Sequence, residues 1–152
     1  MRGIVEVTSR RTIPVEQACV LPAVWEIQNI ERCEVKADVV QVTKETDTRG
    51  SYRVRGRFAG LPWRGQFFYE LNPKGFHSTN APHPRRGTTI SGGFVVEPVG
   101  DHECVVTHYE QYRLPIYFRP LRPMIAWYVA WSMRRELRDL EALVRADLSR
   151  GG

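Results

Sequence analysis

Cysteine is scarce in this sequence. Cys19, Cys33 and Cys104 are the three cysteines among 152 residues, and no two of them form a Cys-x-x-Cys pair. An odd number of widely spaced cysteines does not suit a disulfide framework or a zinc site, and it is typical of reduced thiols. We therefore expect a cytoplasmic protein that needs neither disulfides nor a structural metal.

Long apolar runs are also missing. The longest, residues 124–131, is far shorter than the roughly 20 residues that span a bilayer. The first eleven residues lack the apolar stretch of a signal peptide, and no repeat or Gly-Ser-Pro linker divides the chain. A hydrophobic content of 42% over 152 residues is enough for one core. We expect a single domain over residues 1–152.

Lysine is rare, whereas arginine is abundant. The chain has 3 lysines and 19 arginines against 17 acidic residues, for a net charge of +5. This charge is compatible with an anionic partner, but no basic run exceeds two residues, and a coding bias toward arginine is the favoured explanation. Arg53, Arg55 and Arg57 form a basic stripe that could meet RNA or an acidic protein; a solvated sheet face is favoured. We expect no nucleic-acid partner.

Several motifs of cofactor-dependent enzymes are absent. The sequence contains no GxGxxG, P-loop or GxSxG motif. The histidines, His77, His83, His102 and His108, do not show metal-ligand spacing. We therefore expect no cofactor and no metal site.

Alternating apolar and polar residues predict a sheet in the first two thirds of the chain. In residues 51–59, Tyr52, Val54 and Phe58 fall on one face and the arginines on the other. Short turns at 60–62 and 72–75 make neighbouring strands antiparallel. The predicted strands are 3–13, 35–42, 51–59, 63–71, 76–80, 88–97 and 103–114, with a loop at 81–87.

Proline and helical periodicity predict the helices. Pro14 fits the first turn of a short helix, and Pro22 opens a second one over residues 22–28. From residue 124 onward, apolar residues recur every three or four positions, which predicts an amphipathic helix of about 25 residues. Its apolar stripe is Ala126, Ala130, Met133, Leu137, Leu140, Val144 and Leu148. Its predicted solvated face carries Arg134, Arg135, Glu136, Arg138, Asp139, Glu141 and Arg145.

Four features follow one another in a specific order. They are Ile-Pro-Val-Glu at 13–16 followed by Val24-Trp25, the turn at 72–75, the segments 93–100 and 104–110, and Leu-Arg-Asp-Leu-Glu-Ala-Leu at 137–143. Over nearly the whole chain this order resembles the START/Bet v 1-like (SRPBCC) superfamily, in its polyketide cyclase/dehydrase-like branch. The resemblance implies an α+β helix-grip fold. In that fold a curved antiparallel sheet of about seven strands wraps around a long C-terminal helix, with two short helices after strand 1.

The resemblance also implies an elongated apolar cavity that binds a hydrophobic small molecule, such as a lipid, sterol, polyketide or other aromatic. Large flat side chains suit such a ligand, and Met124, Trp127 and Trp131 are expected near the cavity mouth. Core filling is favoured for any single aromatic, and a cavity for the set. The candidate ligand-binding residues are Trp25, Tyr52, Phe58, Trp63, Phe67, Tyr69, Phe94, Val96, Met124, Trp127 and Trp131.

His108 and Glu110 are the candidate catalytic residues. They lie two positions apart on the last strand and share a face. In an apolar pocket they could act as general acid or base. The residue pattern leaves their direction open, because the opposite phase would turn Thr107 and Tyr109 inward; the resemblance favours His108 and Glu110. A histidine without chemistry is the favoured alternative for His108.

Three functions remain open at this stage. The leading hypothesis is a binding protein for a hydrophobic small molecule. The first alternative is a polyketide cyclase/dehydratase-type enzyme, although the interior arginine that aromatase/cyclase members carry before the 72–75 turn is missing: Tyr69, Glu70 and Leu71 stand there. The second alternative is an interaction module with a filled core. Segment 115–123, apolar and basic, could touch a membrane transiently, and a homodimer is compatible with the sequence.

Overall fold

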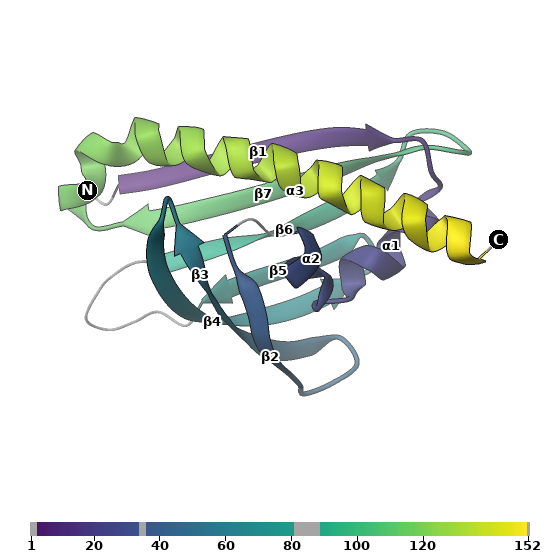
Figure 1. Cartoon of the computed structure of the whole chain (residues 1–152), viewed down its shortest axis with the longest axis horizontal. Helices are drawn as coiled ribbons and strands as arrows, with labels where there is room; N and C mark the ends of the chain where they lie inside the picture. The colour runs from purple at the N-terminus through teal and green to yellow at the C-terminus, as the bar shows by residue number, and fades with distance from the viewer. Residues whose placement is uncertain (1–2, 34–35, 81–88, 152) are drawn as a thin grey trace.

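A seven-stranded antiparallel sheet frames the described part of the chain, which comprises residues 3–33, 36–80 and 89–151 of a computed structural model. The strands lie in the order β1-β7-β6-β5-β4-β3-β2, so β1 pairs with the last strand and the others form a meander (Figure 1). The elements are β1 (Gly3–Ile13), α1 (Gln17–Trp25), α2 (Asn29–Cys33), β2 (Asp38–Lys44), β3 (Arg49–Phe58), β4 (Leu61–Asn72), β5 (Gly75–Asn80), β6 (Thr89–Pro98), β7 (Cys104–Leu114), the 3₁₀ helix η1 (Ile116–Leu121) and α3 (Arg122–Gly151). The predicted helix-grip fold is confirmed.

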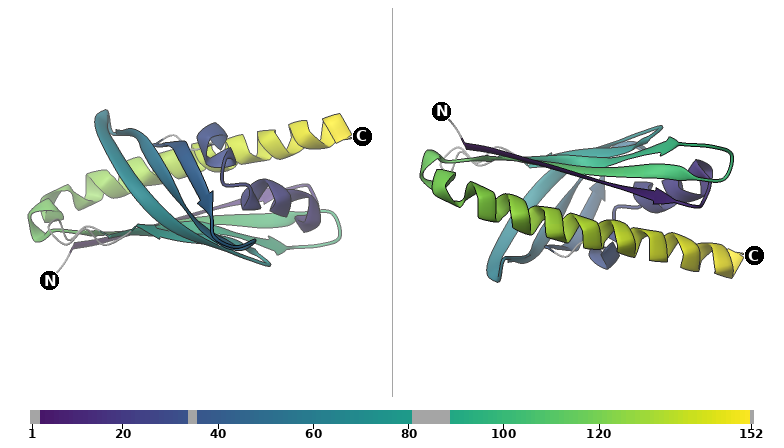
Figure 2. Two further views of the ribbon diagram at one scale, coloured as in Figure 1. Left: turned by 90° about the horizontal axis from the view of Figure 1, so that it is seen from below. Right: turned by 90° about the horizontal axis from the view of Figure 1, so that it is seen from above.

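The long helix α3 lies on the concave side of the bent sheet (Figure 2). Its 30 residues span about 45 Å at 1.5 Å per residue, enough to run along β1 and past the curled strands β2–β4. Arg11 of β1 is tied to Glu141 of α3 by an ion pair of 2.9 Å. Among the described residues, no helix is both long and apolar enough to cross a membrane.

The alternation predicted for β3 and β4 is confirmed. Tyr52 and Val54 are buried, whereas the arginines between and beside them are exposed. On β4, Phe67 and Tyr69 are buried and Phe68, which interrupts the alternation in the sequence, is exposed on the outer face. The predicted loop 81–87 and the first residues of the predicted strands 35–42 and 88–97 lie outside the described residues.

Pro22 lies inside α1 and does not open a second helix, which corrects the prediction. The ring is exposed, and its neighbours Val20, Leu21 and Val24 are buried against the sheet and α3. Burial of these side chains outweighs the local cost of a proline in a helix. The second short helix begins at Asn29, whose side-chain amide donates to the carbonyl of α1 residue Ala23 at 2.8 Å.

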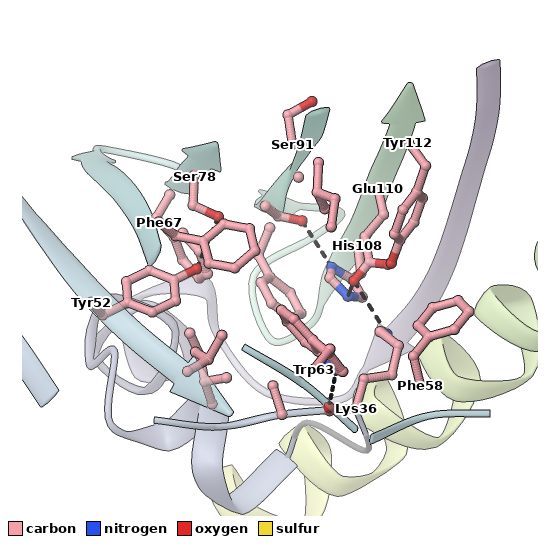
Figure 3. Close-up of a pocket in the computed structure, with 18 of the residues that line it drawn as sticks. Lys36, Tyr52, Phe58, Trp63, Phe67, Ser78, Ser91, His108, Glu110 and Tyr112 are labelled. Carbon is pink, nitrogen blue, oxygen red and sulfur yellow. Dashed lines mark hydrogen bonds and ion pairs between the residues drawn. The ribbon is translucent and has the colours of Figure 1, made fainter. Parts of the chain in front are cut away.

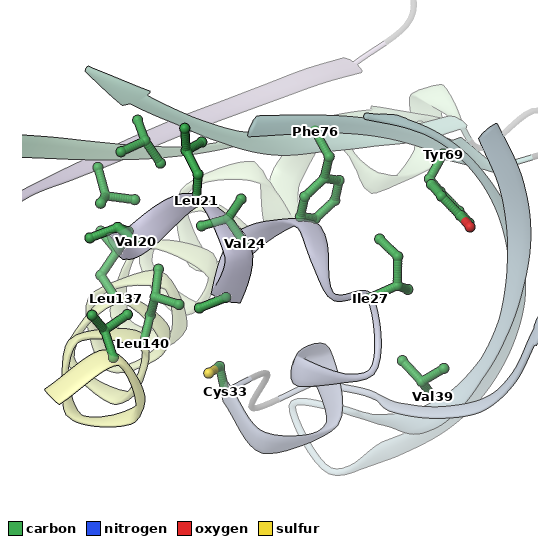
Figure 4. Packing of buried hydrophobic residues seen from close by; sticks show 14 of the residues in the cluster. Val20, Leu21, Val24, Ile27, Cys33, Val39, Tyr69, Phe76, Leu137 and Leu140 are labelled. Atoms are coloured by element: carbon green, nitrogen blue, oxygen red, sulfur yellow. The ribbon is translucent and has the colours of Figure 1, made fainter. Parts of the chain in front are cut away.

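Two apolar clusters hold α3 on the sheet. The larger one packs α1 and the C-terminal half of α3 against the strands, with Val20, Leu137 and Leu140 in contact (Figure 4). The smaller one surrounds Val129 and Met133 nearer the start of α3. Residues of both clusters contribute to the walls of one cavity. The two clusters therefore do not fill the whole concave side of the sheet, and a cavity remains between them.

Candidate functional site

A cavity of about 390 Å³ lies on the concave side of the sheet (Figure 3). Its walls are mainly apolar side chains. The aromatic residues that line it are Tyr52, Phe58, Trp63, Phe67, Phe76, Phe94, Tyr112 and Phe118. The volume falls within the range of small-molecule sites, which is roughly 300–1,000 Å³.

Strand register places the aromatic rings side by side. Tyr52 of β3 is directly opposite Phe67 of β4, and their rings stack with centroids 5.4 Å apart. The rings of Trp63 and Phe67, both on β4, pack edge to face with centroids 6.3 Å apart. Because alternate residues of a strand share one face, the alternation of β3 and β4 builds a continuous aromatic wall.

Several of the predicted ligand-binding residues line this cavity: Tyr52, Phe58, Trp63, Phe67 and Phe94. His108 and Glu110 line it as well, so the inward phase of β7 is the one that the structure adopts. The resemblance favoured this phase, and the residue pattern alone had left it open.

Trp25, Tyr69 and Val96 are placed elsewhere than predicted. Tyr69 and Val96 are buried in the larger apolar cluster and do not line the cavity. The Trp25 indole N–H donates to the carbonyl of Asn72 at 2.9 Å, which ties α1 to the end of β4. These side chains contribute to the scaffold of the cavity.

On the side of α3, the residues that line the cavity also differ from the predicted ones. Met124 and Trp127 are 59% and 66% exposed, and Trp131 packs beneath the Arg135 guanidinium at 5.0 Å. Ile125 of α3 and Phe118 of η1 line the cavity in their place. Ile125 lies one turn from the buried Val129 and so faces the sheet.

A buried ionic cluster, which the sequence analysis missed in part, adjoins the cavity. Its members are Lys36, Glu110, His108 and Glu136. Lys36 Nζ donates to Glu136 Oε1 at 2.7 Å and lies 3.3 Å from Glu110 Oε1. The same ammonium donates to Ser132 Oγ at 2.9 Å. An ammonium has three donors, and these three contacts use them.

His108 is held at both ring nitrogens. Nε2 donates to Glu136 Oε2 at 2.8 Å, and Nδ1 donates to the Gly93 carbonyl at 2.9 Å. Burial by itself lowers the pKa of His108, but hydrogen bonds and charges of Glu110 and Glu136 outweigh it and raise the pKa to about 10. His108 is therefore an imidazolium at neutral pH, and Phe94 stacks on its face with centroids 4.1 Å apart.

Glu110 is the most exposed member of the cluster, and it lines the cavity together with Lys36 and His108. Its side chain is 11% exposed, against 1% for Glu136. Burial raises the pKa of Glu110, but Lys36 and His108 outweigh that effect, so the pKa lies below its ordinary value. The Tyr112 hydroxyl donates to Glu110 Oε2. Glu110 is therefore an ionised carboxylate that faces an apolar cavity.

Lys36 is positioned through its own backbone. The Trp63 indole N–H donates to the Lys36 carbonyl at 2.9 Å. Gly56, opposite Trp63 on β3, lets this carbonyl approach, because a Cβ at Gly56 would lie 2.0 Å from the oxygen. Two strands that also form the aromatic wall thus aim the lysine at the carboxylates.

Glu136 was expected on the solvated face of the long helix, and this prediction was wrong. Glu136 is 1% exposed. It lies about 60° from Met133 around the helix axis, and therefore on the side of α3 that faces the sheet. The buried positions of α3 are Val129, Ser132, Met133, Glu136, Leu137, Leu140 and Val144, and Leu148 is exposed. A sign of this in the sequence is the position of Glu136 directly beside the stripe residue Leu137.

The sequence contains a weaker sign for the role of Lys36 than for that of Glu136. It is one of three lysines in an arginine-rich chain, and a compact ammonium fits between two carboxylates where a planar guanidinium needs more room. The sequence alone does not reveal its partners, because they lie 74 and 100 positions away.

Lys36 also decides what the cluster can bind. His108, Glu110 and Glu136 present ligand-type atoms within 4.8 Å of one another, a geometry that a divalent metal could use. The Lys36 ammonium occupies the position between the two carboxylates. Two cations balance two carboxylates, so these residues do not fit an additional metal cation.

A second polar group faces the cavity away from the ionic cluster. The Tyr52 hydroxyl donates to Ser78 Oγ at 3.0 Å, and both residues are buried. Figure 3 shows this pair on one side of the cavity and His108, Glu110 and Tyr112 on the other. The cavity is thus apolar along its walls, with a polar group at each side.

The predicted rim segment 115–123 exposes apolar side chains. Ile116, Tyr117 and Leu121 are exposed on η1, beside the exposed Met124 and Trp127 of α3. Contact of this surface with a membrane stays a prediction, as does a homodimer.

A scan against protein families matches residues 5–145 to the family described as polyketide cyclase/dehydrase and lipid transport. The chain belongs to the polyketide cyclase/dehydrase and lipid transport family. This confirms the resemblance to the START/Bet v 1-like superfamily. A search of the curated proteins found no match.

Several solved structures share the fold at low identity. A protein from Thermus thermophilus is 20% identical with a TM-score of 0.78, covering 93% of this chain and 98% of its own. The Zhui aromatase/cyclase from Streptomyces sp. R1128 is 10% identical with a TM-score of 0.75, covering 96% of each chain. A START superfamily protein from Mycobacterium smegmatis is 12% identical with a TM-score of 0.70, covering 95% and 99%. At these identities the likeness concerns the fold.

Proposed function

We propose that this member of the polyketide cyclase/dehydrase and lipid transport family binds a hydrophobic small molecule, a lipid, polyketide or other aromatic, in the cavity of the sheet. The observation that carries the proposal is a cavity of about 390 Å³ walled by aromatic side chains. Protein interiors are normally filled to the density of organic crystals, so an apolar space of this size favours a ligand over a filled core.

The choice of an apolar ligand follows from the distribution of charge. The four charged groups of the ionic cluster neutralise one another, because Lys36 and His108 each form an ion pair with both Glu110 and Glu136 at 2.7–3.5 Å. A charged ligand would have to leave water for a cavity that offers it no unpaired counter-charge among these groups, which is costly. A neutral aromatic molecule loses only its contact with water and gains contact with the rings.

The proposal is tested by filling the cavity. Ile90 lines the cavity, whereas Phe68 is exposed on the outer face of the sheet. Fluorescence titration with N-phenyl-1-naphthylamine should show binding to the wild type and to Phe68→Trp. Ile90→Trp should weaken it by roughly tenfold or more, because the added ring occupies ligand space. Equal binding by both variants would place the probe elsewhere. Mass spectrometry of an organic extract of the purified protein would identify a retained ligand.

A second candidate is an acid/base enzyme of the cyclase/dehydratase type, favoured by the opening of the Glu110 carboxylate onto the cavity. His108 is protonated and engaged at both nitrogens, so it is unsuited as a general base and acts as a positioning residue for the carboxylates. Glu110 is the group that could accept a proton from a substrate, although its lowered pKa makes it a weak base.

The enzyme hypothesis is tested with a candidate poly-β-keto substrate. If Glu110 is the base, Glu110→Gln should abolish turnover while N-phenyl-1-naphthylamine still binds. His108→Gln should shift the pH profile of turnover, because it removes one of the charges that depress the pKa of Glu110. Unchanged turnover in Glu110→Gln would exclude this carboxylate as the base, and a wild type without turnover would leave binding as the function.

A further inference from the structure

The geometry points to two-ended recognition: Ser78 donates a hydrogen bond to an acceptor at one end of the ligand, and Glu110 accepts one from a hydroxyl at the other. The ligand class is thus a flat aromatic molecule with a carbonyl or similar acceptor at one end and a phenolic hydroxyl at the opposite end. This inference rests on the proposed function and specifies what the cavity selects.

Ser78 can donate a hydrogen bond to a ligand because its hydroxyl oxygen already serves as the acceptor for Tyr52. The Tyr52 hydroxyl donates to Ser78 Oγ at 3.0 Å. A serine hydroxyl has one hydrogen of its own, and Ser78 Oγ donates no hydrogen bond to the described residues while it accepts the one from Tyr52. Ser78 is buried and lines the cavity, so a ligand acceptor placed there would remove an unmet hydrogen-bond demand.

The Glu110 end is an acceptor because the nearby hydrogens are already used. The Lys36 ammonium has its three contacts, and both N–H groups of His108 are engaged. Glu110 receives the Tyr112 hydroxyl on Oε2 and the two cations near Oε1. A carboxylate offers about four lone-pair positions, so one remains on a side chain that is 11% exposed.

The charge balance decides which kind of donor fits. Lys36 and His108 already neutralise Glu110 and Glu136. A cationic ligand would leave a net positive charge in an apolar cavity, which is costly. A neutral hydroxyl donates to the carboxylate without adding charge.

The two ends lie on one row across the sheet. Ser78 of β5 is opposite Gly92 of β6, and Gly92 is opposite Glu110 of β7. Strands are spaced by about 4.8 Å, so the backbones at the two ends are separated by about 10 Å. Gly92 contributes no side chain between them, and a Cβ there would lie 2.5 Å from the Tyr109 carbonyl. The open row suits a ligand of about two fused rings.

The test uses four naphthalene probes that differ only in their polar ends. They are 6-hydroxy-2-acetylnaphthalene, 2-acetylnaphthalene, 2-naphthol and 2-ethylnaphthalene. Isothermal or fluorescence titration of the wild type should show the hydroxy-ketone binding roughly tenfold or more tighter than 2-ethylnaphthalene, with the two single-function probes between them.

Ser78→Ala should weaken the two ketones by roughly fivefold and leave 2-naphthol unchanged, because only the donor is lost. Glu110→Gln should weaken the two hydroxyl probes. That change disturbs the ionic cluster. The charge-balanced double variant Lys36→Met/Glu110→Leu therefore provides a second test, because it leaves the His108–Glu136 pair intact and should also weaken the two hydroxyl probes. The matched control is Tyr109→Phe, which removes a hydroxyl on the outer face that contacts His77 at 2.8 Å.

The outcomes separate this inference from the proposed function. If no probe binds the wild type, the proposed function fails. If all four bind alike, or if Ser78→Ala weakens all four equally, the cavity binds hydrophobic molecules and two-ended recognition is overturned. Probe-selective losses at each end support it.

Discussion

The buried charges are where single substitutions should have their largest effects. Glu136 accepts hydrogen bonds from Lys36 at 2.7 Å and His108 at 2.8 Å, and it is almost completely removed from solvent. Each member of such a cluster is tolerated only because its partners are present. The cluster also joins residues of β7, α3 and the segment before β2 at one point.

Replacing Glu136 by leucine should lower the free energy of unfolding by about 3–5 kcal/mol, because two buried cations would then share one carboxylate. Urea denaturation measures the loss. The matched control is Glu141→Leu on the same helix, which breaks a half-exposed ion pair with Arg11 and should cost about 1 kcal/mol or less. Equal losses in the two variants would contradict the importance of the buried cluster.

Stability should depend on pH through His108. Its pKa rises from 6.5 to about 10 on folding, so the folded state binds the proton more tightly. This contribution is complete below pH 6.5 and is lost as the pH rises toward 10. The decline should reach up to about 1.4 kcal/mol per pH unit. Urea denaturation at pH 7, 7.75 and 8.5 should show a steeper decline for the wild type than for His108→Gln; parallel curves would refute the shift.

At the scale of elements, α1 shows tertiary packing overriding local preference. Pro22 lies in the interior of the helix, where it cannot donate to the Ala18 carbonyl. The helix persists because Val20, Leu21 and Val24 are buried against the sheet and α3. The register of β5, β6 and β7 in turn decides which polar groups reach the cavity.

Substituting Pro22 by alanine should raise the free energy of unfolding by about 1–2 kcal/mol, because a hydrogen bond is restored and the ring clash is removed, while the unfolded chain gains some entropy. The ring is exposed and belongs to neither apolar cluster. Pro14→Ala, which lies before α1, is the control and should bring no gain. A destabilised Pro22→Ala variant would show that the ring itself has a role.

At the scale of the whole molecule, the cavity links ligand binding to stability. Its walls come from α2, the segment before β2, the strands β3 to β7, η1 and α3, so a ligand there contacts both apolar clusters. The folded state alone offers this site, and any ligand that fits should stabilise it.

Saturation with N-phenyl-1-naphthylamine at about 100 times its dissociation constant should raise the free energy of unfolding by about 2.7 kcal/mol. Differential scanning calorimetry measures this as an increased melting temperature. The increase should be much smaller in the cavity-filled Ile90→Trp variant and unchanged in Phe68→Trp. An equal increase in all three proteins would point to binding outside the cavity.

The type and order of the strands and of the long C-terminal helix were determined by the sequence alone. Alternation in β3 and β4 follows from one face being buried and the other solvated, a local property that needs no knowledge of the partner strand. The three- and four-residue spacing of Met133, Leu137 and Leu140 predicts α3 for the same reason. Tyr52 and Phe67 could thus be assigned to the interior from the sequence pattern, whereas the pattern of β7 left the direction of His108 open.

Only the tertiary structure decided which charges meet. A glutamate on a helix is normally solvated, so Glu136 was assigned to the outer face; its burial depends on Lys36, which lies 100 positions away, and on His108, 28 positions away. The direction of Met124 and Trp127 likewise depends on how α3 is rotated against the sheet. Periodicity records whether a residue is apolar, and the energy of a buried charge depends on partners that folding alone brings within 3 Å.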